Sequence, residues 1–474
     1  NPRSSMSPAP STAARRSALG LCLVLGLAVG VLGGCQSSGD KVESLLEGRI
    51  TVRSDIDDSG DYSGFRVMVA DASGTSIDTL ALTRTGKKGR FRTWVEAPST
   101  GIYPLIIWGR RGQQRLASTE LVVAEGDTAS IDVTFPQRGP FRVRSPENAA
   151  LSGYRNTMAR HRQTLVKQIR GNPEAGTNDM ARSIRQTSSI LWRLQDTYPD
   201  TYASRLAAVE SLSLLEGWND SLVVERAQSI APGNPRYVEA VRIGRRAMAR
   251  WNGQQAALAM LDTFMTEART PEQKAGVQAI RVRTFIDSLE SEAALAAART
   301  LKREYPNSEW ADWADRAMYE VNNLLPGKTA PTFAAQSLRG DSVSLQGLKG
   351  RPVVLEFYRP GSNAFAGQLA TRNAIYQATR GDSVAFVSVS LADSTATRAL
   401  VEGERVPGRH VVAPDGEDGE IPRQYNVTSV PTRFLIDRDG LIVGRYPESA
   451  LLGLSEDLTA LLRDGDTGGE APAP

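Results

Sequence analysis

The sequence has 474 residues, of which 41% are hydrophobic and 23% charged, a composition that excludes a disordered or fibrous protein. The formal net charge of +3 comes from residues 1–34, which contain Arg3, Arg15 and Arg16 and no acidic residue. The rest of the sequence has 53 basic side chains (56 minus 3) and 53 acidic ones. With equal numbers of basic and acidic side chains, this part of the sequence lacks the surplus of positive charge that binds nucleic acid, so we expect no nucleic-acid partner.

Residues 1–34 have the pattern of a secretion signal. Two arginines precede an apolar run, residues 19–32, that is too short to span a bilayer comfortably. The run ends in Leu32-Gly33-Gly34-Cys35, which resembles the lipobox of bacterial lipoproteins. The resemblance implies a lipoprotein signal peptide (1–34), a lipidated Cys35 that anchors the protein, and a tether (35–46). It also implies the bacterial cell envelope, at the periplasmic face of the outer membrane more than at the inner membrane. The alternative is an ordinary signal peptide with a coincidental cysteine.

Residues 47–136 alternate apolar and polar side chains, as at Phe65, Val67 and Val69. Short intervals between turn signals favour a small antiparallel β-sandwich. One loop in this block is rich in aspartate (Asp55, Asp57, Asp58 and Asp61), which could indicate calcium. Position 12 of an EF-hand count is Arg66 where a bidentate glutamate is needed, so we interpret the loop as a solvated turn and expect no metal.

Residues 137–326 follow the 3.6-residue period of helices. Prolines recur near the predicted helix junctions at intervals of 36, 36 and 35 residues, at Pro199, Pro235, Pro271 and Pro306. This spacing predicts an all-α array of helical hairpins, close to the tetratricopeptide length but without its signature residues. We expect the tryptophans of this block, Trp251 among them, to fill seams between helices, and His161 to be exposed.

Residues 327–464 alternate strand and helix patterns, which predicts an α/β domain. Apolar runs at 353–357 and 384–389 predict buried strands, and Asp439-Gly440 predicts a hairpin turn between two further strands. Helical patterns cover 366–379, 395–404 and 451–462. The Gly-, Glu- and Pro-rich end, residues 465–474, is expected to be a disordered tail.

This order of elements resembles the TlpA/ResA-like thioredoxin-fold family, which is related to AhpC/TSA proteins. The resemblance rests on Ala330-Pro331-Thr332-Phe333, on the run from Leu348 to Phe357, and on Ser429-Val430-Pro431-Thr432 before the hairpin. It implies a thioredoxin-like fold for this block. It also implies that the Val430–Pro431 bond is cis and faces the segment where the family carries a Cys-x-x-Cys motif.

The cysteines of that motif are lost here. Ser362 stands at the position of the nucleophilic cysteine and Phe365 at that of the resolving one, and the sequence after Cys35 contains no thiol. Disulfide exchange needs both thiols, so no catalytic residue of that kind is predicted. A hydrolytic Ser362 would need a base, for which His410 is the one histidine in the block. The alternative role of Ser362 is to cap the following helix.

Without the two cysteines, the resemblance still implies the part of the family's site that binds a peptide. Family members hold an extended peptide against the residue before the cis proline, which requires no sulfur. Here the peptide-binding residues would be Val430, Pro431 and Asn363, with Phe365 as an apolar wall; a purely structural Pro431 is equally open. The leading hypothesis is a redox-inactive, membrane-anchored scaffold that binds a protein or an extended peptide and needs no cofactor. The alternative is an envelope thiol-disulfide oxidoreductase, and a third is ligand capture by the sandwich.

Overall fold

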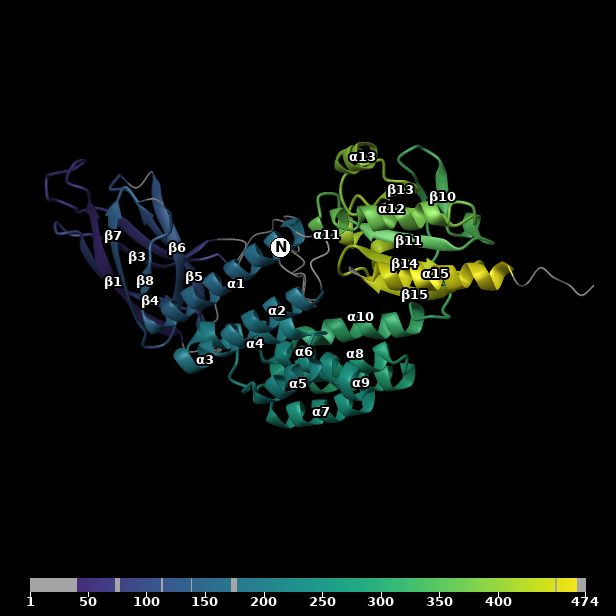
Figure 1. Ribbon diagram of the computed structural model, residues 1–474, viewed down its shortest axis with the longest axis horizontal. Helices are drawn as coiled ribbons and strands as arrows, with labels where there is room; N and C mark the ends of the chain where they lie inside the picture. Colours follow the sequence, from purple (N-terminus) through teal and green to yellow (C-terminus); the bar gives the residue numbers. More distant parts are fainter. Residues whose placement is uncertain are drawn as a thin grey trace, which may run out of the picture. The chain divides into compact units, whose positions relative to one another are not determined.

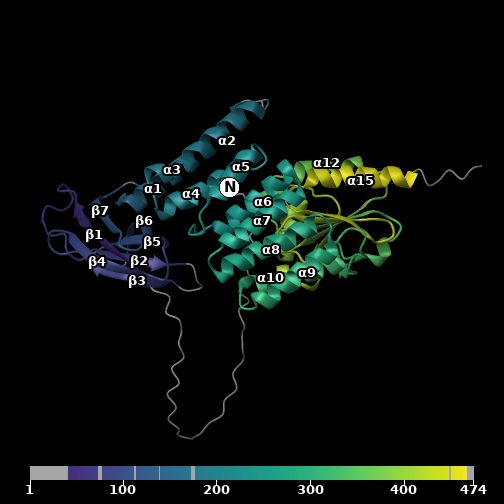
Figure 2. The ribbon, with the colours of Figure 1, turned by 90° about the horizontal axis from the view of Figure 1, so that it is seen from below.

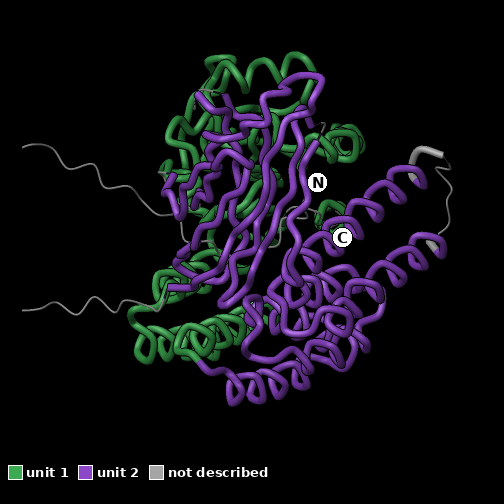
Figure 3. Tube along the Cα trace, turned by 90° about the vertical axis from the view of Figure 1, so that its left-hand side faces the viewer, with its two compact units in different colours: residues 1–16, 270–474 green, residues 17–269 purple. Residues whose placement is uncertain are grey.

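The computed structural model describes residues 41–72, 77–111, 114–137, 139–171, 177–447 and 450–466. The predicted signal peptide, Cys35 and the end of the predicted tail lie outside these residues. The chain forms two compact units, one within residues 17–269 and the other within residues 270–474, coloured purple and green in Figure 3. The boundary falls inside the block that the sequence presents as one helical array.

The first unit begins with a β-sandwich, as predicted, but its first sheet is mixed and not purely antiparallel, because β1 runs antiparallel to β4 and parallel to β7. One sheet has the order β4-β1-β7-β8 and the other β3-β2-β5-β6. The strands are β1 (Val42–Val52), β2 (Arg66–Asp71), β3 (Asp78–Arg84), β4 (Arg90–Ala97), β5 (Gly101–Trp108), β6 (Arg115–Val123), β7 (Thr128–Phe135) and β8 (Val143–Arg144). Inward side chains of both sheets, such as Val67, Leu105 and Val133, form one core. The two sheets are thus held by apolar burial between them.

The sandwich is longer than predicted at both ends. β1 starts at Val42, inside the segment that the sequence suggested as a tether, because Leu45 and Leu46 are buried when the strand pairs with β4 and β7. At the other end β8 adds residues 143–144 to the sheet after the predicted boundary at 136. Polar residues in these two stretches interrupt the alternation of apolar and polar side chains, so the sequence pattern did not extend the strands this far.

The acidic loop of the sandwich is held by its own hydrogen bonds. Asp57 accepts from the backbone N–H of Ser59 (3.1 Å) and pairs with Arg110 at 2.8 Å. The Ser59 bonds, followed by Arg110, lower the pKa of the Asp57 carboxyl. Among the described residues, no group of three or more His, Cys, Asp or Glu side chains is arranged to hold a metal ion.

Helices follow the sandwich in the first unit, as the sequence predicts. They are α1 (Pro146–Gly171), α2 (Thr177–Trp192), α3 (Leu194–Thr197), α4 (Tyr202–Leu215), α5 (Asp220–Ser229), α6 (Tyr237–Asn252) and α7 (Gln254–Glu267). Two expectations are wrong. His161 is buried, and its Nδ1 lies 3.0 Å from the Thr187 hydroxyl on α2. Trp251 is 56% exposed at the end of α6, so it fills no seam.

The proline period marks the helical hairpins. Pro199 precedes α4, Pro235 precedes α6, and Pro271 opens α8 (Pro271–Asp287), whose N-terminus has a capping box between Thr270 and Gln273. Pro271 suits its place because the first turn of a helix does not need the N–H that proline lacks, whereas Pro199 and Pro235 lie in the connections just before their helices. The predicted array of helical hairpins is therefore confirmed.

The second unit joins the last three helices of this array to an α/β domain. These helices are α8, α9 (Ser291–Glu304) and α10 (Glu309–Asn323). A five-stranded sheet follows, with the order β13-β12-β11-β14-β15. Its strands are β11 (Val353–Tyr358), β12 (Ala385–Ser390), β13 (Arg409–Val412), β14 (Thr432–Ile436) and β15 (Ile442–Pro447), and the hairpin β9 (Ala334–Gln336) and β10 (Ser342–Ser344) precedes it.

Both faces of this sheet are covered. On one face α12 (Leu369–Ala378) and α15 (Leu451–Asp466) lie side by side and pack Ile375 and Leu454 against Val354 of β11 (Figures 1 and 2). On the other face Leu355 and Phe357 pack against the segment before the sheet and against α14 (Glu420–Gln424). The remaining helices are α11 (Asn363–Ala366) and α13 (Ser394–Gly403), with short 3-10 turns at 346–348 and 416–418.

The last helix runs further than the sequence suggested. α15 continues to Asp466, two residues into the segment predicted to be a disordered tail.

Within the described part of the chain, no helix is long and apolar enough to cross a membrane.

Candidate functional site

Two loops of the α/β domain meet at one end of the sheet. β11 and β14 are antiparallel, and Phe357 near the end of β11 pairs with Thr432 at the start of β14. The segment after β11 (359–362) and the segment before β14 (429–431) therefore leave the sheet side by side. This register places the Ser362 segment and the Val430–Pro431 segment at the same end of the sheet.

The first loop is a turn followed by a capped helix. Ser362 N–H donates to the Arg359 carbonyl at 3.1 Å, and Gly361 between them has a φ of 80°, which glycine adopts without strain. The Ser362 backbone is extended, and its Oγ accepts from the N–H of Phe365 at 3.5 Å. Ser362 is therefore the N-cap of α11, the role that the sequence offered as its alternative to catalysis. Asn363, the first residue of α11, is exposed.

Phe365 points into the domain. Its side chain is 1% exposed and stacks on Tyr358 with the ring centroids 4.5 Å apart. The expectation that Phe365 forms an apolar wall of a peptide groove is therefore wrong, because an incoming peptide would not reach the ring. The ring instead fixes α11 to the end of β11 by apolar burial.

The second loop contains the cis proline. The Val430–Pro431 peptide bond is cis, which confirms the predicted geometry. The Val430 side chain is half-buried against the domain core, and Ser429 C=O accepts from the Thr432 hydroxyl at 2.8 Å. Within the described residues, neither the N–H nor the carbonyl of Val430 makes a hydrogen bond. These two groups remain able to pair with another chain.

His410 lies near this site but is not arranged as a base. The imidazole is buried; its Nε2 donates to the Val406 carbonyl at 3.2 Å, and its Nδ1 accepts from the Tyr358 hydroxyl at 3.0 Å. The assignment follows because a carbonyl only accepts, so the proton is on Nε2. Burial, and then the nearby Arg372 guanidinium, lower the pKa of His410 to about 4. With both nitrogens occupied and no bond to Ser362, His410 does not activate that hydroxyl.

A buried ionic cluster beneath the site was missed by the sequence analysis. Glu356 on β11 accepts from Arg372 Nε at 2.9 Å, from Arg433 Nε at 2.8 Å and from the Ser388 hydroxyl at 3.0 Å. All of these side chains are at most 2% exposed. Burial by itself raises the pKa of the Glu356 carboxyl, but Arg372 and Arg433 outweigh it and lower the pKa to about 2. The one sign of this cluster in the sequence was Glu356 itself, a charged residue within the otherwise apolar run that forms β11.

The cluster leaves no free base below the loops. Both carboxylate oxygens of Glu356 are occupied, and the group stays ionised at any ordinary pH. Arg433 donates a hydrogen bond through its Nε. Within the described residues, its Nη1 and Nη2 have no hydrogen-bond partner. The end of the sheet therefore combines a serine that caps α11, a carboxylate with both oxygens hydrogen-bonded, and a neutral histidine with both nitrogens hydrogen-bonded.

This fold and these two loops define a thioredoxin-like domain of the TlpA/ResA type. The AhpC/TSA family matches residues 326–445. Thiol-disulfide oxidoreductase ResA of Bacillus thuringiensis (strain Al Hakam) is 31% identical over 141 residues, which cover 28% of this chain and 78% of that protein. Through this C-terminal domain the chain belongs to the AhpC/TSA family of thioredoxin-fold proteins.

Two further matches cover the same domain. A second ResA, from Bacillus thuringiensis subsp. konkukian, is 30% identical over 117 residues, which cover 25% of this chain and 66% of that protein. Among solved structures, the thioredoxin domain of a thiol-disulfide oxidoreductase from Bacteroides vulgatus is 22% identical, with a TM-score of 0.27, and the match covers 29% of this chain and 99% of that one.

Proposed function

We propose that the chain is an envelope lipoprotein whose thioredoxin-like domain has lost disulfide exchange and binds an extended protein segment. The observation that carries the proposal is the loss of both thiols: Ser362 and Phe365 occupy the two cysteine positions, and the sequence after Cys35 has no other cysteine. The roles of the replacements support it, since Ser362 caps α11 and Phe365 packs in the core. Exchange needs a thiolate and a second thiol, which a hydroxyl and a phenyl ring do not replace.

An insulin-reduction assay tests the loss of exchange. We expect the purified protein to give the rate of dithiothreitol alone, while an active thioredoxin accelerates it. The names of the relatives favour the second candidate function, thiol-disulfide oxidoreductase. Acceleration above the baseline that disappears in Ser362→Ala would favour that candidate and overturn the proposal.

Val430 supplies the proposed contact for the extended segment. Its N–H and carbonyl make no hydrogen bond within the described residues, so they can hydrogen-bond to an added strand at the end of the sheet. Partners captured by cross-linking in intact cells should be lost in Val430→Pro, which removes the N–H, and kept in Val430→Ala, which retains it. A second measurement does not depend on the variant: the Val430 amide should exchange hydrogen more slowly when the captured segment is bound. Unchanged exchange and unchanged capture would place binding elsewhere.

Lipidation of Cys35 is the proposed means of anchoring, at the periplasmic face of the outer membrane. The lipobox-like Leu32-Gly33-Gly34-Cys35 supports it. Mass spectrometry of the mature protein from cells should find a diacylglyceryl group on Cys35, and fractionation should place the protein with outer membranes. A soluble protein with an unmodified N-terminus would contradict this part of the proposal without affecting the binding site.

A further inference from the structure

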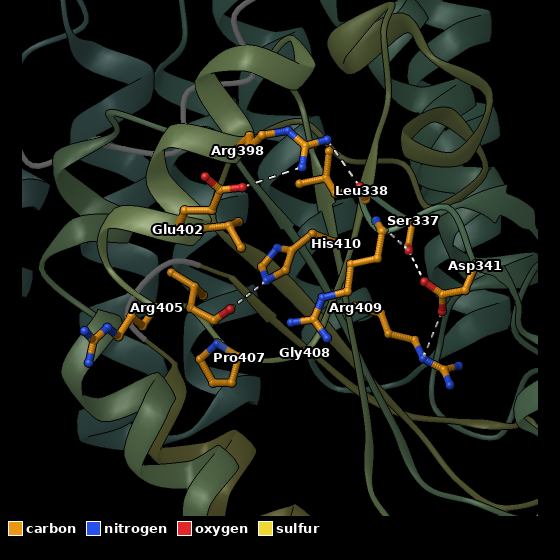
Figure 4. Close-up of a pocket in the computed structure, with 13 residues that line it drawn as sticks. Ser337, Leu338, Asp341, Arg398, Glu402, Arg405, Pro407, Gly408, Arg409 and His410 are labelled. Atoms are coloured by element: carbon orange, nitrogen blue, oxygen red, sulfur yellow. Dashed lines mark hydrogen bonds and ion pairs between the residues drawn. The ribbon is translucent and has the colours of Figure 1, made fainter.

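A charged pocket lies beside the edge strand β13 of the same domain. It has a volume of about 710 Å³ and is formed by α13, the loop that leads into the edge strand β13, and the turn between β9 and β10. Figure 4 shows Arg398 and Glu402 on one side, Ser337 and Asp341 on the other, and His410 between them. This volume is within the range of small-molecule sites, about 300–1,000 Å³.

The lining carries a surplus of positive charge although the body of the protein is balanced. Four arginines face two carboxylates: Arg339, Arg398, Arg405 and Arg409 against Asp341 and Glu402. The local net charge is therefore +2 (four minus two). Residues 35–474 carry 53 basic and 53 acidic side chains, so outside the pocket they carry 49 (53 minus 4) and 51 (53 minus 2), and the positive surplus is confined to the pocket.

The arginines are only weakly neutralised by their neighbours. Arg398 lies 3.6 Å from Glu402, and Arg409 lies 3.7 Å from Asp341; both pairs are about half exposed or more. Such long, solvated pairs contribute little. Arg339 and Arg405 are exposed and, within the described residues, make no ion pair within 4.0 Å and no side-chain hydrogen bond, although the charge of Arg339 helps to lower the pKa of Asp341. Their guanidinium groups are therefore available to a ligand.

The walls of the pocket are held in place before any ligand arrives. Arg398 Nη2 donates to the Leu338 carbonyl at 3.2 Å, which ties the β9–β10 turn to α13. His410 Nε2 donates to the Val406 carbonyl, which ties the loop after α13 to the sheet. A preformed site binds with less loss of conformational entropy than one that must order on binding.

Apolar side chains complete the lining between the arginines: Leu338, Val401, Val406 and Pro407. We propose that this pocket binds a small organic anion, with its phosphate or carboxylate group on the guanidinium groups and its apolar body on these side chains. Guanidinium groups match both oxyanions through paired N–H donors. The pocket is separate from Val430, so the inference does not depend on the proposed function.

Isothermal titration calorimetry on the full chain tests this proposal with phenyl phosphate, benzoate and neutral benzyl alcohol. We expect the two anions to bind and benzyl alcohol not to bind, and the tighter anion identifies the preferred oxyanion. The double variant Arg339→Gln/Arg405→Gln should weaken binding about tenfold or more, since it removes both unpaired guanidinium groups. The matched control, Arg380→Gln/Arg423→Gln, removes the same charge from exposed positions of the same domain and should change binding less than about twofold.

A second measurement avoids substitution altogether. Phenylglyoxal modifies accessible arginines, and peptide mapping of the wild-type protein should show Arg339 and Arg405 protected by the bound anion while Arg380 is not. The proposal is overturned if neither anion gives heat of binding, if both double variants weaken binding equally, or if the anion protects no pocket arginine.

Discussion

His410 is buried as a neutral imidazole, so the stability of the protein should depend on pH. Its pKa is about 4 in the folded protein against 6.5 for an ordinary histidine, because burial disfavours the charged ring. The unfolded chain therefore binds more protons between these values, and stability is complete above pH 6.5 and falls as the pH drops toward 4. The difference corresponds to about 3 kcal/mol.

Urea unfolding of the wild type and of His410→Gln at several pH values checks this prediction. Because glutamine does not titrate, the variant should lose the slope between pH 6.5 and 4.5. The stability that the ionised Glu356 carboxylate contributes is lost at still lower pH, from about 4.5 down to 2. This loss should be the same in both proteins. Parallel curves for the two proteins above pH 4.5 would show that His410 is not the titrating group.

Phe365 is a buried packing residue, so its truncation should lower the stability of the protein strongly. The ring is 1% exposed and stacked on Tyr358. Phe365→Ala should lower the free energy of unfolding by about 3–5 kcal/mol, since it leaves a cavity between α11 and β11. The control Leu452→Ala, at a side chain 73% exposed, should cost less than about 0.5 kcal/mol. Equal effects measured by chemical denaturation would contradict the packing role.

At the scale of elements, the Glu356 cluster joins β11, β14 and α12. Glu356→Gln leaves two buried guanidinium groups without their counter-charge and should cost about 3–5 kcal/mol. Arg433→Met should cost clearly less, because Nη1 and Nη2 of Arg433 have no hydrogen-bond partner among the described residues and Glu356 keeps its bonds to Arg372 and Ser388. Urea denaturation of both variants gives the comparison. A larger cost for Arg433→Met would mean that its Nη groups have partners that stabilise the fold.

At the scale of the whole molecule, α8 to α10 belong with the thioredoxin-like domain. Glu320 on α10 pairs with Arg283 of α8 at 2.9 Å and with Arg445 of β15 at 3.2 Å, and the Tyr319 hydroxyl donates to the Gln424 carbonyl at 2.8 Å. The two arginines hold the pKa of the buried Glu320 carboxyl below its usual range, against the effect of burial. These bonds explain why the compact unit begins before the α/β domain itself.

Glu320→Ala should therefore loosen the connection between these helices and the domain. Lys328 lies in the connecting segment, whose backbone pairs with Ile442 and is protected as long as the two parts remain together. We expect trypsin to cleave after Lys328 faster in Glu320→Ala than in Asp312→Ala, which removes an exposed carboxylate from the same helix. Equal cleavage of the two variants would show that Glu320 does not hold the parts together.

Local patterns determined much of this protein. The apolar run at 353–357 became β11, the proline period marked the helix hairpins, and the motif around Pro431 identified the family and the cis bond. The absence of thiols after Cys35 is likewise visible in the sequence alone. Each of these features depends on residues close together in the chain. Strand, helix and turn preferences act over the same short range, so the sequence alone is enough to predict them.

Only the tertiary structure decided which side chains meet. The sequence placed His161 at the surface and Phe365 at a groove, and the fold buries both. It gave no means of pairing Glu356 with Arg433, which is 77 positions away. The charged pocket likewise gathers the β9–β10 turn with α13, which lies far along the chain. Burial and ion pairing depend on distances in space, which strand register and helix packing set and short-range patterns do not contain.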